Sequence, residues 1–163
     1  MIQRIQTLYL FMVVVLGVLM CLVPLVTFTS VDGEGLFEAW QLRAFGVRNV
    51  EIDRWILGRD ISVGGGSVLG LATLLISLIG LVDIFLYRHR IVQARLGVFL
   101  SIVCLGYYGV VGVYVWYIVF RWGMEWYVNM GMSIPLVCFV LTLMSVRCIL
   151  RDEALVRSYE RLR

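Results

Sequence analysis

One acidic side chain interrupts the long apolar stretches of this 163-residue sequence. Asp83 lies near the end of the apolar run at residues 65–87, and ionisable residues inside membrane spans often mark proton relays or ion pathways. Its position, about one helical turn before the run ends, also suits an ion pair with Arg88, Arg90 or Arg147. An Asp83–Arg147 pair would join the second apolar run to the fourth. We favour the ion pair over the proton relay.

The other reactive side chains form no catalytic constellation. All four cysteines lie in apolar runs, without a C-x-x-C motif, so neither a disulfide framework nor a thiol oxidoreductase is indicated. His89 is the only histidine, and one histidine without a carboxylate cluster does not make a metal site. We therefore assign no catalytic, cofactor-binding or metal-binding residue, and expect no cofactor.

Composition identifies the class of protein that must position these residues. Hydrophobic residues make up 61% of the chain and charged residues 15%, with a mean hydropathy of +0.94, far outside the range of soluble domains. Every basic residue is an arginine, and the arginines are scattered along the chain, which argues against nucleic-acid binding. The sequence therefore predicts an integral membrane protein.

Four apolar runs are long enough to cross a bilayer, which takes about 20 helical residues. They cover residues 7–28, 65–87, 96–120 and 130–150. A loop at residues 29–64 joins the first two runs, short turns join the others, and a charged tail covers residues 151–163. The expected fold is all-α: one membrane domain over residues 1–163, an antiparallel bundle of four transmembrane helices.

Arginine distribution predicts the orientation of this bundle. Nine arginines fall on the side that carries both termini and the turn between the second and third runs. Five fall on the opposite side, mostly in the long loop. Positively charged residues are enriched in cytoplasmic segments. We therefore expect both termini in the cytoplasm.

Small side chains recur along the second apolar run at steps of four and three residues. This spacing places them on one stripe of a helix, where another helix can approach closely. Packing within the bundle is favoured over an oligomer interface, although spacing alone does not separate the two. The stripe contains Gly66, Gly70, Thr73, Ser77 and Gly80.

The loop at residues 29–64 contains an alternating pattern. Trp40, Leu42 and Ala44 alternate with Gln41 and Arg43, which predicts a short strand or a β-hairpin with one apolar face. This face could dock on the rim of the bundle or receive a partner, and docking is favoured.

Aromatic residues surround the turn between the third and fourth runs. Tyrosine and tryptophan are typical of membrane interfaces, and an interfacial belt is favoured here over stacking with a planar ligand. The residues are Tyr114, Trp116, Tyr117, Trp122, Trp126 and Tyr127.

Apolar residues continue into the charged tail at helical spacing, as in Val146, Ile149, Val156 and Tyr159. The fourth helix should therefore extend beyond the membrane as an amphipathic helix, lying along the membrane surface or docking on a partner.

Three segments together resemble a known family. "MIQRIQTLYL", "IFLYRHRIVQARL" and "LRDEALVRSYERLR" are similar to the four-span proteins of the Bacteroidota grouped as domain of unknown function 4293. The resemblance implies a bacterial inner-membrane protein but no activity. On the topology above all three segments face the cytoplasm, which suggests an interaction surface there. That surface comprises Arg4, Gln6, Tyr87, Arg90, Gln93, Asp152, Glu153, Arg157 and Arg161.

Three functional classes are open to such a chain. We expect a non-catalytic accessory or scaffold subunit of an envelope complex, with membrane lipid and either a protein partner or a second copy as its partners. The alternatives are a small transporter acting as an oligomer and a membrane-embedded enzyme. Against a transporter, the outer halves of all four apolar runs lack an acidic coupling residue. An aspartate-dependent membrane peptidase would need two membrane-level aspartates.

Overall fold

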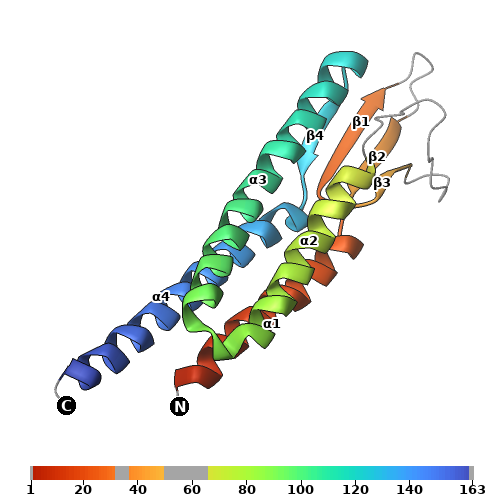
Figure 1. The fold of residues 1–163 in the computed structure, drawn as a ribbon. Coiled ribbons are helices and arrows are strands. Elements are labelled where there is room, and N and C mark those ends of the chain that lie inside the picture. Colours follow the sequence, from red (N-terminus) through yellow and green to blue (C-terminus); the bar gives the residue numbers. More distant parts are fainter. Residues whose placement is uncertain (1, 32–36, 50–65, 162–163) are drawn as a thin grey trace.

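The computed structural model is an elongated bundle of four helices with a small antiparallel sheet at one end (Figure 1). It describes residues 2–31, 37–49 and 66–161. Successive helices run in opposite directions, so both termini lie at the end of the bundle away from the sheet. We call this the terminal end, and the other the sheet end.

The helices are α1 (Ile2–Leu22), α2 (Gly66–Phe85), α3 (Arg90–Trp122) and α4 (Ile134–Arg161). Short 3₁₀ turns, η1 (Leu86–Arg88) and η2 (Met130–Ser133), precede α3 and α4. Both α1 and α3 pack mainly against α2 and α4, so the helices enclose a common core.

Three helical segments are long and apolar enough to cross a membrane: Val68–Phe85, Arg90–Trp122 and Met130–Leu155. The apolar part of α1, Gln6–Leu22, is shorter. The helical architecture predicted from the apolar runs is thus confirmed, and α4 continues through the tail to Arg161 as expected.

The sheet contains β1 (Val26–Val31), β2 (Phe37–Arg43), β3 (Gly46–Asn49) and β4 (Glu125–Val128), in the order β3-β2-β1-β4. Phe28 on β1 pairs with Trp40 on β2 and Trp126 on β4. Phe28 and Leu42 are fully buried in the same core cluster as residues of α3, so the apolar face of the sheet docks on the bundle.

The first apolar run, predicted as one span over residues 7–28, is not helical throughout. Helix α1 ends at Leu22, and β1 begins at Val26. Pro24 has no N–H to donate and disfavours helical geometry in the residue before it. The sequence "VTFTSV" that follows is rich in β-branched residues and contains one aromatic residue, and both types favour a strand.

The turn between the third and fourth runs also differs from expectation. It was predicted as an aromatic turn, but it contains β4, which completes the sheet beside β1. The expected hairpin-like loop is therefore part of a larger sheet. The connection between α1 and α2 contributes β1, β2 and β3, and the connection between α3 and α4 contributes β4. Helix α3 extends beyond residues 96–120 at both ends, and Gly123, at a φ of 64°, ends it in the left-handed conformation.

Candidate functional site

Asp83 occupies the centre of the bundle near the terminal end. Its side chain is 0% exposed, and neither carboxylate oxygen has a hydrogen-bond partner in the described part of the chain. Gly97 of α3 lies beside it, since a Cβ at Gly97 would be in ordinary van der Waals contact with Asp83 Oδ2, at 3.6 Å. The same Cβ would lie 2.6 Å from a methyl group of Val146 on α4. The carboxylate therefore lies where α2, α3 and α4 meet.

The predicted ion pair between Asp83 and Arg147 is not formed. Arg147 is exposed on α4, whereas Asp83 is buried. Val146 faces Gly97 in the core, and the next residue on a helix points about 100° away. Arg147 is therefore directed away from the bundle centre. An unpaired charge at such a buried position is energetically unfavourable.

Buried hydrogen bonds join the helices towards the terminal end. Gln93 Nε2 on α3 donates to the backbone oxygen of Asp83, at 3.1 Å. Gln6 Nε2 on α1 donates to Asp152 Oδ2 on α4, at 2.7 Å, across 146 residues of sequence. Ser145 Oγ on α4 is buried without a hydrogen-bond partner in the described residues. We call Gln6, Asp83, Gln93, Ser145 and Asp152 the buried polar cluster.

This arrangement corrects part of the predicted interaction surface. Gln6, Gln93 and Asp152 were expected to face the cytoplasm, but all three are buried between helices. Long polar side chains at helix ends can satisfy each other inside a bundle as well as at its surface, and here they do.

Other members of the predicted surface remain accessible. Tyr87 is exposed, and Arg90 and Glu153 are half-buried. Glu153 takes part in an interaction within the chain. The structure gives only helix positions, without side-chain surroundings, for three members of the surface: Arg4, Arg157 and Arg161.

From Gly70 to Gly80, the small-residue stripe of α2 faces inward. A Cβ at Gly70 would meet the ring of Phe45 in the β2–β3 turn, and Thr73 Oγ1 lies 3.5 Å from the Tyr107 hydroxyl on α3. Ser77 fills the space left by Gly17 on α1, and Gly80 lies against Val14. Gly66 begins the helix. These contacts all lie within one chain.

Aromatic residues at the sheet end are mostly exposed. Trp116 and Phe120 stack with ring centroids 5.9 Å apart. The Tyr127 hydroxyl donates to Glu125 Oε2 at 2.9 Å, and this hydrogen bond raises the pKa of Tyr127. Tyr114, by contrast, is buried. The sheet-end aromatics therefore form an outward-facing rim.

The buried polar cluster has limited chemical capacity. Asp83 could take up a proton or a cation, and the glutamines hold neighbouring helices together. Across residues 2–31, 37–49 and 66–161, no three His, Cys, Asp or Glu side chains gather as a metal ion would require. Sequence reasoning missed Ser145, although its spacing of three from Thr142 places it on the same inward stripe of α4.

A family model for the domain of unknown function DUF4293 matches residues 2–162. The chain belongs to the DUF4293 family. The match runs through all four helices and the whole sheet, so the DUF4293 domain includes both the buried polar cluster and the sheet end. No curated protein and no solved structure matches the chain.

Proposed function

We propose that this DUF4293 protein is a non-catalytic accessory or scaffold subunit of an assembly in a bacterial inner membrane. The observation that carries the proposal is the construction of the terminal end. Buried hydrogen bonds such as Gln6–Asp152 fix the helices to one another, while Tyr87 and Arg90 remain at the surface. A rigid frame with accessible charged and aromatic groups is suited to holding a partner.

Membrane embedding is supported by the outer faces of the helices, which expose many large apolar side chains. A contiguous apolar surface of this kind is unfavourable in water and favourable in lipid. Examples from three helices are Leu8, Phe11, Leu71, Leu78, Ile102 and Leu105.

The first crossing needs an extended segment in addition to α1. The apolar part of α1, Gln6–Leu22, is only about 25 Å long at 1.5 Å per residue. Beyond it the backbone of Leu25 donates to Leu42 O at 2.8 Å and accepts from Asn129 N at 3.1 Å. Non-helical backbone at membrane depth requires such pairing. We infer a fourth crossing completed by this paired segment.

The inferred orientation places the terminal end in the cytoplasm, because nine of the fourteen arginines lie on that side. Helix α4 continues past the apolar segment that ends at Leu155 and reaches Arg161. Its last turns would then lie on the cytoplasmic side.

The proposal is tested by affinity isolation of the full chain from its native membrane in mild detergent, with native mass determination of the complex. We expect one partner in fixed stoichiometry. Arg90→Ala combined with Arg157→Ala should release it, whereas Arg151→Ala, an exposed α4 arginine outside the surface, should not. A lone monomer or homodimer, or equal retention in all variants, would contradict the scaffold.

The buried carboxylate of Asp83 favours a second candidate, a small proton- or cation-coupled transporter. Unpartnered ionisable groups inside membrane bundles often lie on ion pathways. In proteoliposomes with an imposed pH gradient, Asp83→Asn should abolish the proton or cation flux across the membrane. Asp152→Asn, which replaces the hydrogen-bonded carboxylate at the same end of the bundle, should reduce that flux far less. Flux that survives Asp83→Asn, or none in the wild type, would exclude this candidate.

A further inference from the structure

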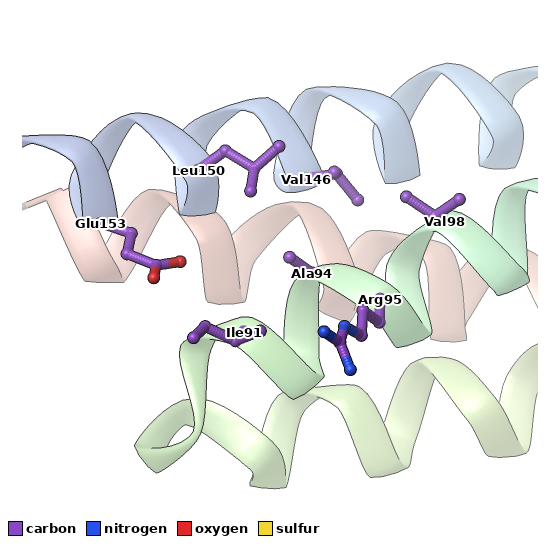
Figure 2. Close-up of a pocket in the computed structure, with 7 residues that line it drawn as sticks. All are labelled: Ile91, Ala94, Arg95, Val98, Val146, Leu150 and Glu153. Atoms are coloured by element: carbon purple, nitrogen blue, oxygen red, sulfur yellow. The ribbon is translucent and has the colours of Figure 1, made fainter.

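A pocket of about 330 Å³ opens between α3 and α4 near the terminal end. Figure 2 shows its two walls, one from each helix. The size falls within the range of small-molecule sites. The lining residues are Ile91, Ala94, Arg95 and Val98 from α3, and Val146, Leu150 and Glu153 from α4.

Each helix contributes one face to the pocket, since the lining positions on both recur at steps of three or four residues. Ala94 and Val146 are almost fully buried and form the floor, whereas Ile91, Val98 and Leu150 are about half exposed at the rim. The pocket is therefore an apolar groove open to the side of the bundle, where lipid would surround a membrane-embedded chain.

Two side chains of opposite charge, Arg95 and Glu153, are among the residues that line this apolar groove. Arg95 is exposed, and an arginine guanidinium presents a planar fork of donors that matches phosphate oxygens. Glu153 already takes part in an interaction within the chain. A carboxylate has about four acceptor sites, however, so Glu153 can accept a further hydrogen bond.

We propose that this pocket binds one zwitterionic aminophospholipid of the phosphatidylethanolamine type. An acyl chain lies along Ala94 and Val146, Arg95 binds the phosphate, and Glu153 accepts a hydrogen bond from the ammonium group. A lipid with a net negative headgroup would place uncompensated charge beside Glu153, and a choline headgroup has no N–H to donate. The proposal rests on the membrane embedding argued above and not on the scaffold role.

The test uses the purified full chain in detergent and native mass spectrometry during titration with phosphatidylethanolamine, phosphatidylglycerol or phosphatidylcholine. We expect one tightly bound phosphatidylethanolamine per chain, with a Kd at least about tenfold lower than for the other two lipids. Arg95→Gln removes a charge-assisted contact and should raise that Kd about tenfold or more. Glu153→Gln should remove the preference over phosphatidylcholine.

Matched variants separate the pocket from general attraction of arginines to lipid headgroups, which is expected near any membrane surface. Arg147→Gln, at an exposed α4 arginine that does not line the pocket, should leave the Kd unchanged. Leu150→Trp should obstruct the groove and weaken binding. Leu105→Trp is the matched control, because Leu105 and Leu150 are both 51% exposed and only Leu150 lines the pocket.

Equal affinities in Arg95→Gln and Arg147→Gln, undiminished binding in Leu150→Trp, or a preference for phosphatidylglycerol would each overturn the assignment. A chain that purifies in aqueous buffer without detergent or lipid would instead contradict membrane embedding. Failure of the pocket is thus distinguishable from failure of the proposed membrane location.

Discussion

The sheet end and the terminal end are both held together by polar groups, but in different ways. At the sheet end, strand pairing joins backbone groups, and the polar side chains of Asn129 and Thr27 meet at 2.8 Å. At the terminal end, each helix satisfies its own backbone, so contacts between helices depend on side chains such as Gln6 and Asp152.

The difference lies in what remains unsatisfied. Asp83 and Ser145 are buried on the terminal side of the core, and neither side chain has a hydrogen-bond partner among the described residues. At the sheet end Arg43 Nε is also buried without a partner, but the other guanidinium nitrogens of Arg43 donate to Leu22 O and Gln41 Oε1. Unsatisfied buried polar groups are unfavourable, and where they persist they frequently mark functional positions. We infer that the sheet end serves stability and that the terminal end carries function.

The largest expected effect comes from removing the aromatic side chain at the centre of the sheet. Phe28→Ala should lower the free energy of unfolding by about 3–5 kcal/mol, because it empties a fully buried position. The measurement is denaturant titration in mixed micelles followed by circular dichroism. Trp126→Ala, at its half-exposed partner on the edge strand β4, should have a much smaller effect. Equal losses would contradict docking of the sheet on the bundle.

The next effect concerns the hydrogen bond between α1 and α4. Asp152→Ala leaves Gln6 buried without its acceptor, so the free energy of unfolding should fall by about 1–3 kcal/mol. Replacing both residues with leucine should restore most of this loss, because no polar group is then left unpaired. Arg151→Ala, at the adjacent exposed position, should change stability by less than about 0.5 kcal/mol. A double variant as unstable as the single one would indicate that helix packing, rather than hydrogen bonding, was lost.

A third variant has the opposite sign. Asp83→Leu removes an unpaired buried carboxylate and should stabilise the protein by about 1–2 kcal/mol in the same titration. Thr142→Val is the control, because the Thr142 hydroxyl is hydrogen-bonded to Cys138 O at 2.7 Å and its loss should bring no gain. Destabilisation by Asp83→Leu would show that the carboxylate is satisfied in the protein, and the comparison between the two ends would then fail.

The helices could be predicted from sequence because each requires a long apolar run, a strong local signal. Strand β4 could not, since Trp126 and Tyr127 suit a membrane interface as well as a strand. Only pairing with β1, about a hundred residues earlier, decides between these alternatives, and no local spacing reveals such a partner.

The polar residues of the terminal end were harder to place than the apolar ones. Gln6 and Asp152 were assigned to a surface because polar side chains near helix ends usually face water, yet they satisfy each other in the core. One signal was present: Asp152 continues the stripe of Val146 and Ile149 at steps of three residues. Beside Asp83, the missing side chain of Gly97 lets Val146 of α4 approach α3 closely, and this follows from packing rather than from sequence pattern.

The smallest expected effect tests whether an exposed hydrogen bond between ionisable groups at the sheet end persists in solution. The hydrogen bond from Tyr127 to Glu125 raises the pKa of Tyr127, because it favours the neutral phenol and the neighbouring carboxylate opposes the phenolate. A raised pKa means that the contribution to stability is present below the unfolded-state pKa and is lost as pH rises through the folded-state pKa. Glu125→Gln should therefore move the alkaline absorbance titration of this tyrosine to lower pH, with Tyr127→Phe identifying its share of the signal. An unchanged titration in Glu125→Gln would mean that the exposed pair does not persist in solution. The side-chain hydrogen bonds that persist in solution would then be those shielded from solvent, such as Gln6–Asp152 and Asn129–Thr27.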